Sequence, residues 1–123
     1  MAQNKIQRFG PVAMSTTLTT NIINPAIAGT GAVGYTATAT YIVLRHIRIV
    51  NKTGSAATFS LWLGATGANA AGTEVIGQGL SVAANTAFDW YGLLRLDAAD
   101  FLVGGSGTAT ALSFEAEGEV GLA

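Results

Sequence analysis

The chain is 123 residues long, carries a formal net charge of −1 and has no cysteine, and charged residues make up only 11% of it. A typical soluble domain has roughly 25% charged residues, so this composition is that of one charge-poor domain. The lack of cysteine excludes disulfides and thiol chemistry, and the near-neutral balance argues against nucleic acid or an anionic membrane as a partner.

The first 40 residues are rich in Thr, Ala, Gly and Asn. They predict an extended N-terminal arm and a first strand or hairpin, with residues 12–21 as the candidate strand. Residues 29–34 match the G-x-G-x-x-G pattern of dinucleotide sites. Such a site needs a helix after the glycines, but residues 35–41 are a β-forming run, so we interpret the glycines as a loop. No apolar run is long enough to span a bilayer and no signal peptide is recognisable, so we expect synthesis in a cytoplasm.

Residues 41–51 are rich in β-branched side chains and long enough for a central strand. Their apolar alternation is interrupted at Leu44 and Arg45, which indicates a bulge or a twist. His46 is the only histidine and lies between Arg45 and Arg48. Neighbouring cations disfavour a protonated imidazole, and no G-x-S-x-G motif accompanies it. We therefore interpret His46 as a surface or interface residue.

Residues 58–63 alternate so that Trp62 lies on the face opposite the aliphatic side chains. An exposed tryptophan is typical of binding sites, so Trp62 is a candidate interface residue, with a position at the rim of the core as the alternative. Residues 74–79, 86–91 and 100–103 are further candidate strands. In the second of them Tyr91 lies on the face opposite Trp90, which we expect to be in the core.

Residues 112–120 show the clearest alternation, with Glu115, Glu117 and Glu119 on one face and apolar side chains on the other. Aligned carboxylates can bind calcium or contribute to acid–base chemistry. Two other interpretations are preferred: a solvated or edge face that discourages aggregation, and a charge contact with a basic patch on a neighbouring subunit. Arg45, Arg48 and Lys52 would form such a patch.

Seven or eight short strands separated by Gly, Asn and Asp turns predict an all-β fold, an antiparallel β-sandwich of which the jelly roll is one arrangement. The expected organisation is an N-terminal arm with a first strand or hairpin over residues 1–40 and a sandwich domain over residues 41–123.

Charge is missing from two stretches, residues 9–44 and 53–73. Exposed surface normally carries charge for solubility, so we expect the arm and one side of the sandwich to be buried against other subunits, including copies of the same chain. The candidate interface residues are Phe9, Ile22, Ile23, Ile27, Tyr35, Arg45, His46, Arg48, Trp62, Tyr91, Glu115 and Glu117.

Three segments, residues 46–64, 80–86 and 93–102, resemble small virion proteins of tailed bacteriophages. They share a strand that ends in Asn, an Ala/Thr turn, a short aliphatic strand and an Ala-Ala-Asn-Thr turn before an aromatic strand. The resemblance covers roughly residues 41 to 120 and implies a β-sandwich protein of the phage particle. It supplies no catalytic residue, and residues 1–40 lie outside it.

The resulting expectation is a non-enzymatic virion protein without catalytic residues, metal or cofactor. A capsid decoration (cement) protein that binds the major capsid protein and forms homo-oligomers fits best on size. The alternative is a tail, baseplate or head-fibre module that binds a carbohydrate or receptor through Trp62 and Tyr91. A small hydrolase that uses His46 and a glutamate is the weakest hypothesis.

Overall fold

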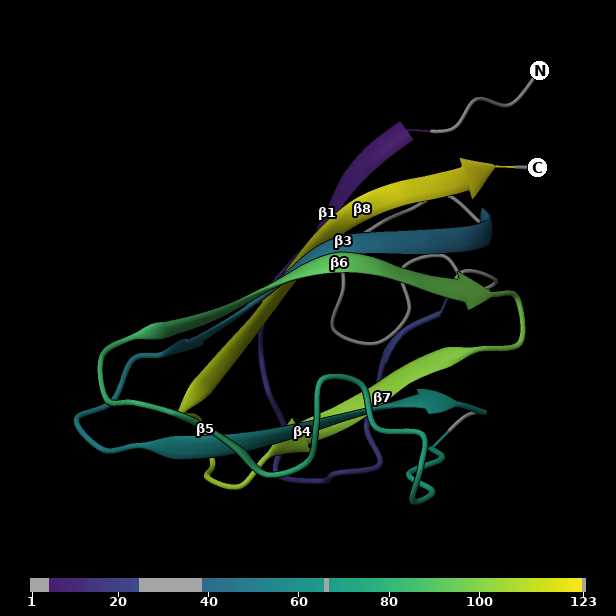
Figure 1. The fold of residues 1–123 in the computed structure, drawn as a ribbon. Helices are drawn as coiled ribbons and strands as arrows, with labels where there is room; N and C mark the ends of the chain where they lie inside the picture. Colours follow the sequence, from purple (N-terminus) through teal and green to yellow (C-terminus); the bar gives the residue numbers. More distant parts are fainter. Residues whose placement is uncertain (1–4, 25–38, 66, 123) are drawn as a thin grey trace.

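The computed structural model describes residues 5–24, 39–65 and 67–122, and these form eight β-strands joined by turns and loops. The strands pair into two antiparallel four-stranded sheets that stack face to face (Figure 1), which confirms the predicted β-sandwich. In chain order the strands are β1 (Lys5–Ala13), β2 (Asn21–Ile23), β3 (Ala39–Asn51), β4 (Ala57–Gly64), β5 (Leu80–Val82), β6 (Ala87–Asp97), β7 (Phe101–Ser106) and β8 (Leu112–Leu122). Among the described residues there is no helix with the length and apolarity to cross a membrane.

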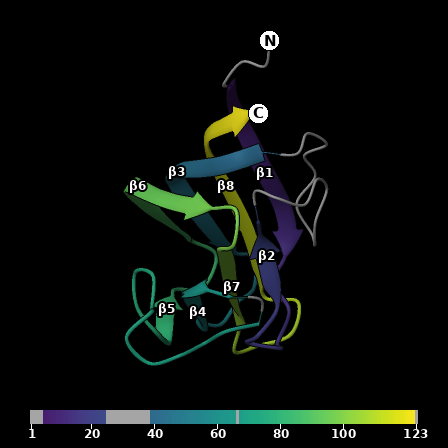
Figure 2. The same cartoon turned by 90° about the vertical axis from the view of Figure 1, so that its right-hand side faces the viewer.

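Sheet A has the strand order β1-β8-β3-β6 and sheet B the order β2-β7-β4-β5. Figure 2 shows the four strands of sheet A following one another across the upper layer, with β1 and β6 at its two borders. The first and last strands of the chain are therefore neighbours in one sheet. Most of the fold is held by pairings between residues far apart in sequence, as expected of a sandwich whose strands alternate between layers.

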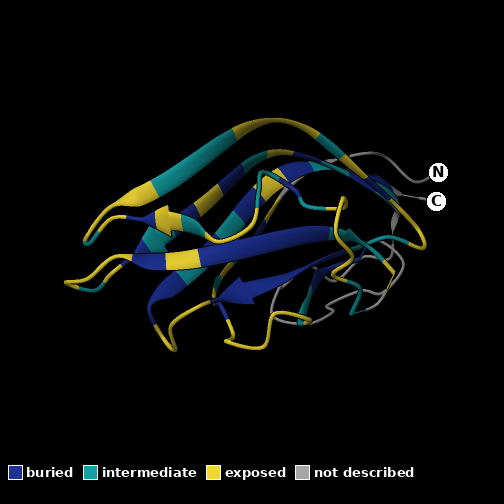
Figure 3. Ribbon diagram, turned by 60° about the horizontal axis from the view of Figure 1, so that its bottom comes forward, coloured by how far each residue is buried: buried dark blue, intermediate teal, exposed yellow. Residues whose placement is uncertain are grey.

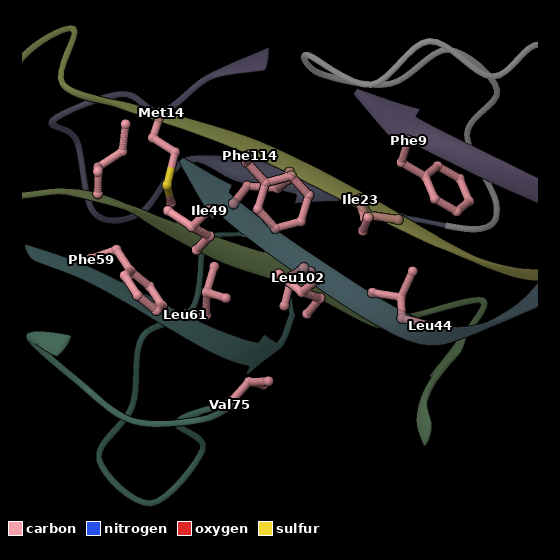
Figure 4. Packing of buried hydrophobic residues seen from close by; sticks show 14 of the residues in the cluster. Phe9, Met14, Ile23, Leu44, Ile49, Phe59, Leu61, Val75, Leu102 and Phe114 are labelled. Carbon is pink, nitrogen blue, oxygen red and sulfur yellow. The ribbon is translucent and has the colours of Figure 1, made fainter. Parts of the chain in front are cut away.

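The core lies between the two sheets and is filled by the inward-facing side chains of both (Figure 4). Phe9, Leu44 and Phe114 enter it from sheet A, and Phe59 and Leu102 enter it from sheet B. Each is at most 1% exposed. Burying one such side chain stabilises the fold by about 1.5–3 kcal/mol, so the period-two pattern of the sequence is what holds the two layers together.

The predicted N-terminal arm is not confirmed, because residues 5–13 form β1, which pairs with β8 at the edge of sheet A. The predicted strand over residues 12–21 is wrong. β1 begins and ends earlier, and a loop joins it to β2, which pairs with β7. The reason is packing: Phe9 and Met14 are buried in the core on either side of an irregularity between Phe9 and Val12, and this anchors the chain to sheet A.

The predicted bulge in the central strand is confirmed. The register of β3 shifts between Leu44 and His46 against both β6 and β8. Gly118 lies opposite Leu44 on β8, where a Cβ atom would overlap the carbonyl oxygen of Val43. Glycine is thus required where β8 passes the bulge.

Two further predictions need correction. Residues 74–79 do not form a strand; only Glu74 forms an isolated bridge, with Trp62, and β5 follows at Leu80–Val82. The strand expected over residues 86–91 continues to Asp97 as β6. Its pairing with the long strand β3 explains the extension, since β3 offers partners as far as Tyr41.

Candidate functional site

The charged residues gather on the outer face of sheet A, which we call the charged face. Successive side chains of a strand point to opposite sides of the sheet, so the residues between the core positions of β1, β3, β6 and β8 point away from sheet B. Of the charged residues in the ranges 39–65 and 67–122, only Lys52, Glu74 and Asp100 lie elsewhere. The charged face consists of Arg8, Tyr41, Arg45, His46, Arg48, Asp89, Tyr91, Arg95, Asp97, Glu115, Glu117 and Glu119.

Asp89 is the centre of one cluster on the charged face. Its Oδ1 accepts a hydrogen bond from Arg48 Nε at 2.8 Å and lies 2.7 Å from His46 Nε2. The Arg48 hydrogen bond, followed by the one to His46, holds the pKa of the Asp89 carboxyl below its usual value. The same bond to Asp89 raises the pKa of Arg48. The β3–β6 register produces this cluster, because it places Arg48 directly opposite Asp89.

His46 is enclosed by its neighbours, and its side chain is 13% exposed. Its Nε2 faces Asp89, and its Nδ1 lies 3.7 Å from Glu117 Oε1. The ring of Tyr91 stacks on the imidazole with a centroid distance of 4.7 Å and an interplanar angle of 12°. Both ring nitrogens therefore face carboxylates of neighbouring strands, and the contacts of His46 are those of a structural residue in a cross-strand network.

A second cluster surrounds Tyr41. Its hydroxyl donates a hydrogen bond to Glu119 Oε2 at 3.0 Å, and the guanidinium of Arg95 lies over its ring, 4.5 Å from the centroid. Arg95 Nε also donates to Asp97 Oδ1 at 2.8 Å, and Arg45 approaches Glu119 at 3.6 Å. Exposed pairs of this kind contribute only about 0–1 kcal/mol each. Their main effect is that acidic and basic side chains of the charged face neutralise one another.

The glutamates of β8 do not line an edge, since β8 lies between β1 and β3. Glu117 is opposite Arg8 on one side and His46 on the other, and Glu115 is opposite Arg48. The acidic and basic groups that we expected to meet across a subunit boundary therefore meet within one chain. Sequence reasoning missed this because the offset between β3 and β8 depends on a pairing of segments far apart in sequence.

Trp62 faces away from the inter-sheet core, as its alternation predicts, but it is only 2% exposed. After β4 the chain crosses the outer side of sheet B, and Gly67 N donates a hydrogen bond to Asn21 Oδ1 at 2.8 Å near the β2 edge. It then returns to β4, where Val75 N donates to Leu61 O at 2.8 Å and Glu74 bridges Trp62. We call residues 64–65 and 67–75 the covering segment. The prediction of Trp62 as an exposed contact residue is corrected by this segment, which buries the indole within the chain.

The other predicted interface residues fall into three groups. Phe9, Ile22 and Ile23 are at most 6% exposed and belong to the core, which corrects their assignment to a contact surface. Ile27 and Tyr35 lie outside the described residues, as does the glycine pattern of residues 29–34. The remaining predicted residues are brought together on the charged face: Arg45, His46, Arg48, Tyr91, Glu115 and Glu117.

Six members of the charged face were not among the predicted site residues: Arg8, Tyr41, Asp89, Arg95, Asp97 and Glu119. The available signal was the alternation of Asp89, Tyr91 and Arg95 along one strand face. Extending the predicted strand to Asp97 and pairing it with residues 41–51 would have placed opposite charges across from each other.

Two of the hollows formed by the described residues border the sandwich, and neither contains a residue of the charged face. An apolar cavity of about 140 Å³ lies between the end of β1 and β2 and includes Met14, Ile22 and Phe114. A shallow groove of about 470 Å³ lies beside β6 and is formed by Leu63, Gly72 to Ile76, and Leu94. Among the described residues, no group of three or more His, Asp or Glu is arranged to hold a metal ion.

Comparison with known proteins adds no assignment: no protein-family model matches the chain, and no curated protein matches it.

Proposed function

We propose that the chain is a non-enzymatic structural protein of a tailed-phage virion, a capsid decoration (cement) protein that binds the major capsid protein and stabilises the head. The observation that carries the proposal is an exposed surface of uncharged residues on the sheet B side, bordered by the half-buried Glu74, whose carboxylate accepts a hydrogen bond from Gly72 N. The residues of this surface, which we call the neutral surface, are the exposed stretches 15–19, 69–73 and 107–110.

The three stretches of the neutral surface lie around sheet B, which comes forward in Figure 3 with its buried strands and exposed loops. The 15–19 loop is fixed to β7 by a hydrogen bond from Ser106 N to Ser15 O at 2.8 Å. Leu18 is 38% exposed within it. Interface centres are depleted in charge, whereas free surfaces use charge for solubility. This contrast with the charged face supports a protein that turns its sheet B side to another subunit and its sheet A side to water.

The strand order supports the same role at the level of fold. We infer that the sandwich is a jelly roll, because two four-stranded sheets in the orders 1-8-3-6 and 2-7-4-5 have the connectivity of that fold. Viral capsid domains and lectins both use it. A shared fold does not establish a shared function, so the proposed function has to be argued from the surface residues of this chain. The neutral surface favours capsid binding, and the burial of Trp62 argues against the sugar-binding tail module.

The proposed mechanism is burial and requires no chemical step. A stable interface buries about 1,600 Å² in total, and many copies bound to one shell act together through avidity. Decoration would then resist shell expansion or rupture because each copy ties neighbouring capsid subunits to one another.

Co-sedimentation of the purified protein with expanded, empty capsids tests the proposal. Ala109 is exposed on the neutral surface, and Ala99 is exposed in the turn between β6 and β7. We expect Ala109→Glu to reduce the bound fraction at least ~10-fold, since a charge buried without a partner costs more than 1.4 kcal/mol. The matched variant Ala99→Glu keeps wild-type binding. Failure of the wild-type chain to sediment with capsids, or equal binding of both variants, would contradict the proposal.

A further inference from the structure

β6 is a long sheet edge that no described strand pairs with on its far side. It has 11 residues and pairs only with β3. The edge strands of sheet B, β2 and β5, have three residues each, and β1 contains Pro11 and an irregularity between Phe9 and Val12. Short strands, proline and bulges protect an edge from pairing with another chain. β6 is long and contains no proline; its register against β3 shifts only between Tyr91 and Leu94, next to Gly92.

The side chains of β6 also leave its edge open. Tyr91 and Leu93 are 71% and 76% exposed, the largest values among the exposed large apolar residues. The two charged groups beside them turn back onto the sheet: Asp89 binds Arg48 of β3, and Arg95 lies over the ring of Tyr41. Charged side chains that normally guard an edge are thus held away from it by contacts within the chain.

The sequence of β6 is complementary to itself in the antiparallel direction. With a two-fold axis at Gly92, Tyr91 of one copy would lie opposite Leu93 of the other, and Asp89 opposite Arg95. On the inner side, Trp90 would lie opposite Leu94; both are partly buried, and Leu94 also lines the groove beside β6. Aromatic–aliphatic pairs and pairs of opposite charge are the combinations that stabilise directly opposed residues in antiparallel strands.

We propose that β6 pairs with β6 of a second copy of this chain, antiparallel about Gly92, to form a dimer with one continuous eight-stranded sheet. The interface is isologous, so every contact occurs twice. Main-chain hydrogen bonds and the Tyr91–Leu93 pairs supply affinity. Asp89 and Arg95 exchange their contacts within the chain for one another across the axis, and these pairs fix the register. A second copy is the occupant because the complementary pattern is contained in β6 itself. The inference concerns the edge of sheet A, which meets the neutral surface only at the groove shared by Gly72, Thr73 and Leu94, and it does not rest on the proposed function.

Sedimentation velocity of the full chain over a concentration series tests the dimer. We expect the mass to rise from 12.5 kDa to twice that value. Leu93→Lys, which places two lysines in the symmetric patch, should return the protein to the monomer. Ile6→Lys is the matched control, because Ile6 is 61% exposed on the opposite edge strand β1. A wild-type chain that stays monomeric at every concentration, or equal effects of both lysines, overturns the proposal.

A charge-exchange experiment tests the register. Asp89→Arg alone places two arginines opposite each other across the interface, and Arg95→Asp alone places two aspartates opposite each other, so each variant should be monomeric. Mixing the two single variants pairs arginine with aspartate at both symmetric sites, so the mixture should form a heterodimer. As a second test, both changes are combined in one chain. The double variant Asp89→Arg/Arg95→Asp restores an arginine–aspartate pair at both sites and should dimerise with about wild-type affinity.

Circular dichroism of each of these variants checks that it is folded. If the folded single variants dimerise as the wild-type chain does, or if the folded double variant stays monomeric, the antiparallel pairing about Gly92 is wrong.

Discussion

Replacing Trp62 by alanine tests whether this residue belongs to the structure of the chain or to a ligand site. The indole is 2% exposed beneath the covering segment, on the side of sheet B that faces away from the main core. Truncating a buried tryptophan to alanine costs about 3–5 kcal/mol. A domain has only about 5–15 kcal/mol of stability, so Trp62→Ala should remove a large part of it.

For a chain of this length the loss corresponds to a fall in Tm of about 12–20 °C, at about 4 °C per kcal/mol. Thermal unfolding followed by far-UV circular dichroism measures it. Tyr91→Ala is the control at a concentration where the chain is monomeric, because Tyr91 is 71% exposed and within one chain loses only its stacking on His46. We expect that change to cost about 1 kcal/mol or less.

Hydrogen exchange adds a local measurement of the same prediction. The amides of Gly67 and Val75 donate hydrogen bonds that hold the covering segment to β2 and β4. In Trp62→Ala both amides should exchange faster than in the wild-type protein, while amides of sheet A keep their protection relative to global unfolding. If Trp62→Ala melts like Tyr91→Ala and leaves the covering segment protected, the indole is not buried within the chain. The interpretation of Trp62 as an exposed binding residue would then stand.

Three further predictions concern the sheet, the charged face and a buried turn. Gly118→Ala should cost about 3 kcal/mol in denaturant unfolding, because its Cβ would overlap the Val43 carbonyl oxygen. Gly54→Ala, with open space around it, should be nearly neutral. Because the pKa of Asp89 is lowered, the ionised carboxylate stabilises the folded chain above about pH 4, and this stabilisation is lost as the pH falls through the folded-state pKa. Asp89→Asn should therefore flatten the acid limb of a plot of unfolding free energy against pH. An unchanged acid limb would contradict this. Asn51 is 1% exposed and its amide donates to two backbone carbonyls, so Asn51→Ala should lower the free energy of unfolding by about 2–4 kcal/mol, and a loss below about 1 kcal/mol would show that the turn is held otherwise.

Local sequence patterns predicted the parts of the fold that local physics determines. Alternation of apolar residues identified the strands that became β4 and β8, and the break at Leu44 and Arg45 identified the bulge in β3. Aspartates were also expected to form turns between strands, and in the turn between β6 and β7 Asp100 N donates to Asp97 O at 2.9 Å. In each case the signal lies within one strand or one turn.

The errors arose where distant segments decide the outcome. A low-charge N-terminus is compatible with an arm or with an edge strand, and only the pairing of β1 with β8 distinguishes them. The covering segment was also misjudged because a distant segment decides its position. Its Gly, Ala, Thr and Asn residues resemble an intersubunit loop, but Gly67 N donates a hydrogen bond to Asn21 on β2. The charged face was predicted in part, because Arg48 and Glu115 were recognised but the register that pairs them was not.

The measurement that tests the proposed function most directly is footprinting of the protein on and off expanded capsids by hydrogen exchange. Capsid binding through the neutral surface predicts new protection in residues 15–19, 69–73 and 107–110, while the solvated charged face, followed at Tyr91 and Arg95, is unchanged. Protection confined to the charged face, or no protection anywhere in the presence of capsids, would contradict the proposed mode of binding.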